Sequence, residues 1–160
     1  GEKMAKKVLF VCIHNSARSQ IAEALLKKYG GNLFEVESAG FEPSNINPLV
    51  IEILQREEKI DISKNTSDSV FDLFKQGKSF NFVITVCDEG NAQRCPIFPG
   101  LNYKLHWSFS DPSLVKGNTL EKYHKVKDIY QSIKEEVLKF IELVKEEKLK
   151  DNFPNNWRVG

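Results

Sequence analysis

A cysteine and an arginine, Cys12 and Arg18, stand six positions apart near the start of the chain. The backbone N–H groups between them can curl inward as an anion nest, and the arginine adds a planar fork with bidentate reach to two oxyanion oxygens. The intervening residues are Ile13, His14, Asn15, Ser16 and Ala17. The segment therefore predicts a loop that holds a tetrahedral oxyanion beside a nucleophilic thiolate.

The sequence on either side of this segment supports the same prediction. Residues 7–11 form a short apolar run suited to a buried strand, and residues 19–28 have the composition of a helix. The partly positive N-terminus of that helix would face the anion and stabilise the Cys12 thiolate. Cys and Arg at this spacing also occur by chance, as a buried cysteine beside a surface arginine. The strand-then-helix placement favours the anion-binding loop.

Two further cysteines, Cys87 and Cys95, stand at the end of an apolar run and in the segment that follows it. Seven residues separate them and no second cysteine pair is present, which argues against a zinc site. They are either unrelated thiols or a redox relay, in which Cys87 attacks an adduct or disulfide at Cys12 and Cys95 then attacks Cys87.

Asp111 precedes a proline, which favours an extended conformation for the aspartate. It is either part of an ordinary turn or a general acid that protonates a leaving oxygen.

Strands and helices are expected to alternate along the chain. The expected strands are 6–12, 34–40, 80–87 and 104–109; the expected helices are 18–29, 48–59, 68–75 and 120–147; a loop is expected over 88–100. This order predicts an α/β fold with a parallel sheet covered by helices on both faces. Ligands of such sheets bind beyond the carboxyl ends of the strands, so Cys12, Cys87 and Asp111 should converge on one rim.

The composition fits one domain, which we expect to span residues 4–160, with residues 1–3 as a tag remnant and 149–160 as a tail of unknown role. A net charge of +1 gives no reason to expect nucleic acid as a partner. No apolar run could span a bilayer and no secretory signal is evident, so we expect a cytoplasmic protein. Three cysteines fit a reducing compartment.

Taken together, these motifs resemble those of the thioredoxin-coupled arsenate reductases, which share the fold of the low-molecular-weight protein tyrosine phosphatases. The similarity runs to about residue 145 and is carried by segments 8–23, 38–40, 47–48, 61–63, 83–87, 95–96, 106–107 and 111–112. The resemblance implies an α/β fold in which a four-stranded parallel sheet is flanked by helices on both faces.

The resemblance also implies a role for each motif. Residues 13–18 would bind arsenate, or phosphate or sulfate as its analogue, and Ser19 would stabilise the Cys12 thiolate. Cys12 would attack arsenic, Asp111 would act as the general acid, and Cys87 would attack the adduct and release arsenite. A disulfide between Cys87 and Cys95 would then be reduced by thioredoxin.

No tightly bound cofactor is implied, although some members bind a potassium ion. Its ligands here would be Asn15, Glu23, Ser38 and Asp68. His14 and Ala17 differ from the glycine and cysteine that are usual at these positions in the phosphatases, and we expect His14 to be structural. A monomer is expected.

The leading hypothesis is an arsenate reductase, and the alternative is a phosphatase that hydrolyses a phosphocysteine at Cys12. Two features separate them. Phosphatases place aromatic residues after the Asp-Pro pair, where Ser113 and Leu114 stand here, and they have no use for Cys87 and Cys95. A third possibility is a non-catalytic module that senses oxyanions or redox state.

Overall fold

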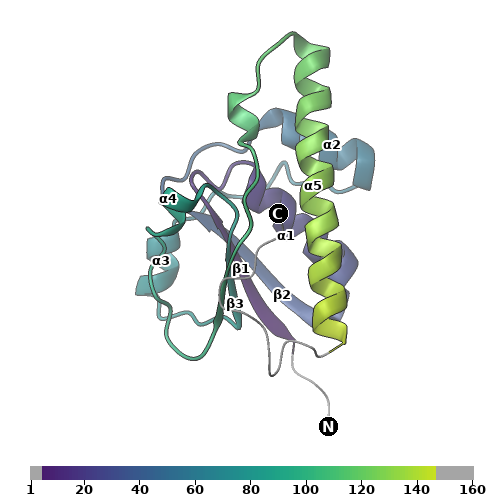
Figure 1. The fold of residues 1–160 in the computed structure, drawn as a ribbon. Helices are drawn as coiled ribbons and strands as arrows, with labels where there is room; N and C mark the ends of the chain where they lie inside the picture. The colour runs from purple at the N-terminus through teal and green to yellow at the C-terminus, as the bar shows by residue number, and fades with distance from the viewer. Residues whose placement is uncertain (1–4, 147–160) are drawn as a thin grey trace.

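The computed structural model describes residues 5–146, which form a four-stranded parallel sheet with helices on both faces (Figure 1). The strands are β1 (Lys6–Cys12), β2 (Phe34–Gly40), β3 (Phe82–Thr85) and β4 (Tyr103–His106), in the order β2-β1-β3-β4. The predicted fold is confirmed. The tail, 149–160, lies outside the described residues.

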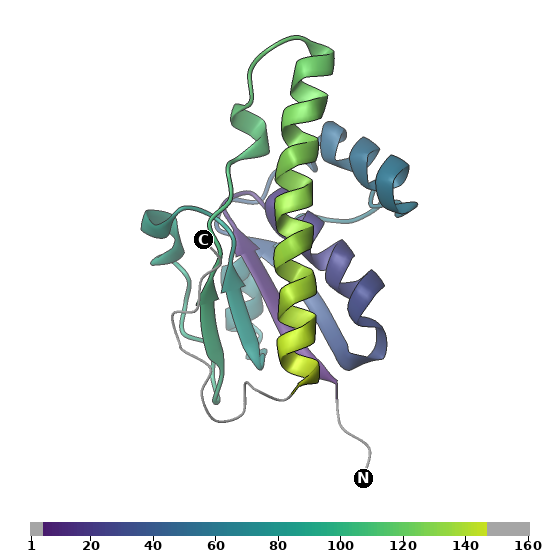
Figure 2. The ribbon, with the colours of Figure 1, turned by 45° about the vertical axis from the view of Figure 1, so that its right-hand side comes forward.

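The helices are α1 (Arg18–Gly30), α2 (Pro48–Glu58), α3 (Val70–Lys75), α4 (Glu89–Ala92) and α5 (Thr119–Lys145). Helices α1 and α5 pack together on one face of the sheet, and α3 lies behind the sheet in the view of Figure 2. Short 3₁₀ turns follow α1, at Gly31–Leu33, and precede the last helix, at Pro112–Leu114. None of the helices in residues 5–146 combines the length and apolar character that a membrane crossing requires.

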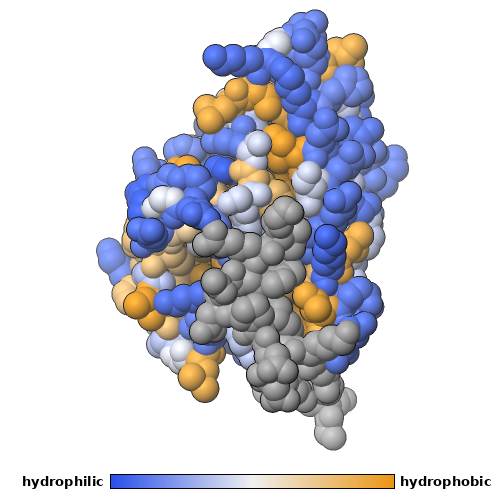
Figure 3. Space-filling view, viewed as in Figure 1, coloured by the Kyte–Doolittle hydropathy of each residue, from blue (hydrophilic) through white to orange (hydrophobic). Residues whose placement is uncertain are grey.

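Helix α5 supplies much of the core through one apolar stripe. Val126, Ile133, Val137, Phe140 and Ile141 are buried, and the stripe's outer members, Ile129 and Val144, are half-buried. The opposite side of the helix is polar, and the face drawn in Figure 3 is accordingly hydrophilic along most of α5. The predicted start of this helix is one residue late, because Asn118 and Glu121 form a capping box that starts it at Thr119.

Helix α4 contradicts the prediction of a plain loop over residues 88–100. It is one turn long and begins where the Asp88 side chain accepts a hydrogen bond from the backbone N–H of Asn91. Its sequence, Glu-Gly-Asn-Ala, has poor helix propensity, so the turn depends on this cap. The predicted strands 80–87 and 104–109 were also too long, because only Phe82–Thr85 and Tyr103–His106 are paired in the sheet.

A buried carboxylate, Glu58, joins three helices beside the sheet. It is the last residue of α2 and accepts hydrogen bonds from Lys28 and Tyr29 of α1 and from Tyr130 of α5, with Lys134 of α5 at 2.9 Å. Burial opposes its charge, but these partners outweigh burial and lower the pKa of Glu58 to about 2. The cluster holds α1, and hence the loop before α1, at a fixed position.

Candidate active site

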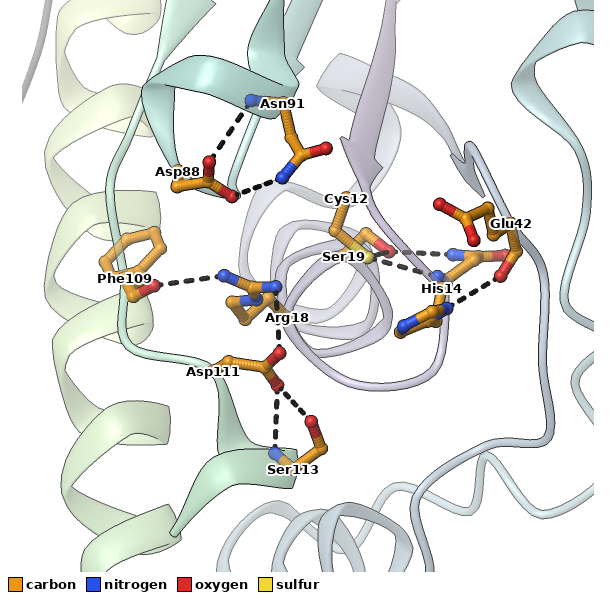
Figure 4. Close-up of polar contacts among 11 residues, drawn as sticks. Cys12, His14, Arg18, Ser19, Glu42, Asp88, Asn91, Phe109, Asp111 and Ser113 are labelled. Carbon is orange, nitrogen blue, oxygen red and sulfur yellow. Dashed lines mark hydrogen bonds and ion pairs between the residues drawn. The ribbon is translucent and has the colours of Figure 1, made fainter. Parts of the chain in front are cut away.

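The predicted anion loop lies between the carboxyl end of β1 and the start of α1 (Figure 4). Cys12 is the last residue of β1 and is 2% exposed. Its Sγ lies 2.8 Å from the hydroxyl of Ser19 and 3.2 Å from the backbone N–H of Asn15, which donates to it. A thiolate at this position would therefore accept hydrogen bonds from two sides.

A chain of hydrogen bonds fixes the direction in which Ser19 donates. The Asn15 side-chain amide donates to Ser19 Oγ at 2.8 Å and to Ser38 Oγ at 2.9 Å, and Ser38 in turn donates to Glu23. Because Ser19 Oγ already accepts from Asn15, its own hydroxyl proton is free to point at Cys12 Sγ. The Ser19 hydroxyl and the Asn15 N–H are thus both directed at Cys12 Sγ, the atom that would attack an oxyanion.

Carbonyl groups of the loop accept hydrogen bonds from residues on its outer side. Residues Glu42, Ser44 and Asn47 donate backbone hydrogen bonds to the carbonyls of residues 13, 14 and 16, at 2.7–3.0 Å. The His14 ring nitrogen Nδ1 donates to the Glu42 carbonyl at 2.8 Å, so His14 braces the loop from outside, which agrees with the structural role expected for it. With its carbonyls turned outward, the loop keeps its N–H groups for an anion.

The start of α1 completes the anion site. Ala17 is its N-cap and has no side-chain capping hydrogen bond, which leaves amides of the first turn for a bound oxyanion. Arg18, 5% exposed, donates from Nη1 to the Phe109 carbonyl at 3.2 Å, and its Nη2 lies 3.5 Å from Asp111 Oδ2. The guanidinium thus links the loop to the segment that follows β4.

Asp111 occupies that segment and faces Arg18, as Figure 4 shows. Its Oδ1 accepts hydrogen bonds from the backbone N–H and the hydroxyl of Ser113, at 2.9 and 2.8 Å. Oδ2 has the Arg18 guanidinium as its partner. The structure therefore brings Cys12, Arg18 and Asp111 to one rim, where the sequence predicted them.

His106, the last residue of β4, anchors the chain that leads to Asp111. Its Nδ1 lies 2.7 Å from Thr85 Oγ1 of β3, and its Nε2 lies 2.9 Å from Ser108 Oγ. Burial lowers the pKa of His106, although Asp88 opposes the effect, so the ring is neutral and offers one donor and one acceptor.

Cys87 lies two residues beyond β3 and is fully buried. Burial raises the pKa of this thiol to about 12, and the nearby Arg18 guanidinium only partly offsets burial. Cys12 and Asp88, like burial, raise the pKa of Cys87. Strand β3 pairs with β1 in parallel, with Thr85 opposite Val11, and the Val86 N–H donates to the Val11 carbonyl at 2.8 Å, so Cys87 follows its strand at the same edge of the sheet as Cys12.

Cys95 follows α4 and is half-buried. Burial raises its pKa to about 11, with Lys104 opposing the shift. It lines a pocket of about 510 Å³ with Val83 and Thr85 of β3 and Leu105 of β4. Neither Cys12 nor Cys87 lines this pocket, and all three cysteines are free thiols.

The four predicted potassium ligands do converge. Glu23, Ser38 and Asp68 line one pocket, and the Asp68 backbone N–H donates to Asn15 Oδ1 at 2.9 Å. However, the Lys27 ammonium lies 2.5 Å from Glu23 Oε2 and lines the same pocket. A cation bound there would have to displace this half-exposed lysine side chain from Glu23, and the potassium ligands stay a prediction.

Across residues 5–146, moreover, no set of three or more histidine, cysteine or carboxylate side chains is placed to hold a metal.

Two residues of the site were not singled out from the sequence. Gln20 donates from its side chain to the carbonyls of Asn15 and Thr66, and so fixes the loop to the segment before α3. Glu42 holds His14 and the loop from outside. The only available signal for Gln20 was its place as the third residue of the helix that follows the anion loop, and no signal pointed to Glu42.

Comparisons with known proteins agree with this geometry. The family model described as low molecular weight phosphotyrosine protein phosphatase matches residues 7–150. A protein named arsenate reductase from Halalkalibacterium halodurans is 36% identical over 140 residues, which cover 87% of this chain and 98% of that protein.

Solved structures give the same result. An arsenate reductase from Archaeoglobus fulgidus is 30% identical with a TM-score of 0.64, covering 84% of this chain and 98% of that one. A thioredoxin-dependent arsenate reductase from Corynebacterium glutamicum is 31% identical with a TM-score of 0.66, covering 91% and 64%.

Proposed function

Because the chain belongs to the low molecular weight phosphotyrosine protein phosphatase family, we propose that it is an arsenate reductase of that family, with three working cysteines. The observation that carries the proposal is the position of Cys87. This thiol is fully buried and follows β3, the strand that pairs with β1, so it stands at the same edge of the sheet as Cys12, where a phosphatase has no need of a second cysteine. The names of the matching proteins support the same activity.

In the first step, arsenate binds the N–H groups of the loop and the Arg18 guanidinium. The Cys12 thiolate, held by Ser19 and the Asn15 N–H, attacks arsenic. A sulfur–arsenic bond forms, and one oxygen leaves as water after Asp111 protonates it. The ion pair between Arg18 and Asp111 would loosen as the dianion takes over the guanidinium.

In the second step, the Cys87 thiolate attacks Cys12 Sγ. A sulfur–sulfur bond forms while the sulfur–arsenic bond breaks, and its electron pair reduces arsenic(V) to arsenic(III), which leaves as arsenite. Cys95 then attacks Cys87, which releases Cys12 as a thiolate and leaves a Cys87–Cys95 disulfide. Two electrons from thioredoxin, the reductant named for the relative from Corynebacterium glutamicum, would restore the thiols.

The test is arsenate-dependent oxidation of NADPH in the presence of thioredoxin and thioredoxin reductase. Wild-type protein should turn over, and Cys87→Ser should not. Hydrolysis of para-nitrophenyl phosphate serves as the control, because it needs the loop, Arg18 and Asp111 but not Cys87; Cys87→Ser should retain it. Full arsenate turnover by Cys87→Ser, or none by wild type, would refute the reductase and leave the phosphatase.

A further inference from the structure

The segment that carries Cys95 is fastened to the anion loop through Arg94. The Arg94 guanidinium lies 3.0 Å from Glu42 Oε2 and 3.1 Å from Asn91 Oδ1. It also stacks over the ring of Phe41, with 4.9 Å to the ring centroid. Arg94 therefore pairs the turn after α4 with the residues that follow β2, 52 positions away in sequence.

Glu42 connects this contact directly to the anion loop. Its backbone N–H donates to the Ile13 carbonyl at 2.7 Å, and its carbonyl accepts from His14. Figure 4 shows Glu42 against His14 on the outer side of the loop. The side chain of the same residue binds Arg94. The Arg94 contact with Glu42 and Phe41, which we name the latch, thus ties the Cys95 segment to the substrate loop.

The latch holds the residue before Cys95 against Glu42 and Phe41. Cys87 is fully buried just beyond β3, whereas Cys95 follows α4 and is half-buried. Cys95 faces the pocket beside β3 and β4, which Cys87 does not line. For Cys95 to leave this pocket and attack the buried Cys87, the segment that Arg94 holds would have to move.

We propose that Arg94 is a positioning residue whose latch keeps the Cys95 segment in place until the Cys12–Cys87 disulfide has formed, and whose release sets the rate of the last exchange. In that exchange the Cys95 thiolate attacks Cys87 Sγ, the Cys12–Cys87 bond breaks, and Cys12 leaves as a thiolate; the Cys95 proton passes to solvent, and no net oxidation occurs. The inference rests on the proposed function.

The test compares Arg94→Gln with Arg56→Gln. Arg56 is a matched control, because it makes the same two kinds of contact far from the site: it lies 3.0 Å from Glu52 and 5.6 Å from the centroid of the Tyr123 ring. The first readout is the rate at which iodoacetamide alkylates Cys95 in the arsenate-free protein, followed by peptide mapping. Because Arg94→Gln removes a partly exposed ion pair and one cation–π contact, it should raise the alkylation rate of Cys95 by about three- to tenfold. Arg56→Gln should leave this rate unchanged.

Salt gives a second signature of the latch. Arg94 and Glu42 have side-chain exposures of 41% and 60%, so their ion pair is screened by added salt. Alkylation of Cys95 in wild type should therefore quicken between about 0.05 and 0.5 M salt, and Arg94→Gln should lose this dependence. The charge-exchanged double variant, Arg94→Glu with Glu42→Arg, should return the alkylation rate toward that of wild type.

The third readout is a single turnover with arsenate and without reductant, stopped with acid. Arg94→Gln should release arsenite at the wild-type rate but form the Cys87–Cys95 disulfide several times faster. If Arg94→Gln and Arg56→Gln show the same rate of Cys95 alkylation and the same rate of Cys87–Cys95 disulfide formation, the proposed role of Arg94 is wrong, whether or not arsenite is released. A latch effect on alkylation, with no arsenite from wild type, would instead reject the proposed function while the positioning contact stands.

Discussion

The burial of Cys87 makes the reductive step strongly dependent on pH. Attack on the Cys12 adduct requires the Cys87 thiolate, and burial raises the pKa of this thiol to about 12. At pH 7 about one molecule in 10⁵ would carry the thiolate, and at pH 9 about one in 10³. The single-turnover rate of arsenite release should thus rise close to tenfold per pH unit between pH 7 and 9. This slope holds for any pKa of Cys87 above about 10.

The assay is rapid mixing of the reduced enzyme with excess arsenate, acid quenching and measurement of both arsenite and the Cys12–Cys87 disulfide. Hydrolysis of para-nitrophenyl phosphate by the same protein corrects for the ionisation of the oxyanion and of the anion loop, because that reaction does not use Cys87. The Cys87→Ser variant, which should release no arsenite, gives the background.

A release rate that is flat from pH 7 to 9 and still requires Cys87 would refute the reasoning. It would mean that another group removes the proton of Cys87 or that the thiol leaves its buried position before it reacts. A slope near tenfold per unit, with a flatter profile for phosphate ester hydrolysis, would agree with attack from the buried thiol.

Three further predictions concern single residues. Asp111→Asn should lower kcat for para-nitrophenyl phosphate by about a hundredfold or more, because the amide cannot protonate the leaving oxygen; an unchanged kcat would exclude Asp111 as the acid. Gly40→Ala should lower kcat/KM for the same ester by about a hundredfold with the fold retained by circular dichroism, because the new Cβ would lie 2.7 Å from the backbone of Asn15 and Ile13 and displace the anion loop. Glu58→Gln should lower the free energy of unfolding at pH 7 by about 3 kcal/mol, because the pKa of Glu58 is about 2 in the folded protein against an ordinary 4.5. The stabilisation from Glu58 is complete above pH 4.5 and is lost as the pH falls through 2. Urea titrations of the variant at a series of pH values should therefore lack this part of the acid dependence.

The parts of the molecule that were predictable from sequence are those set by local pattern. Cys12, the loop and Arg18 lie within one strand–loop–helix unit, so seven consecutive residues specify the anion site. The apolar runs and the periodic stripe of α5 specified the four strands and the long helices, because side chains alternate along strands and recur every three to four residues along helices. Helix α4 was missed since its residues favour a turn and only the Asp88 cap makes them helical.

Relations between distant residues were decided by the tertiary structure. The order β2-β1-β3-β4 places β1 between β2 and β3, which sets Ser38 beside Asn15 and brings Cys87 to Cys12 and Arg18. A linear sequence shows which residues could do chemistry but not which thiol is buried, and burial sets the pKa of each. For the same reason the sequence named three cysteines as one possible relay, whereas only the fold shows that Cys87 is fully buried beyond β3 and that Cys95 is half-buried and lines a separate pocket.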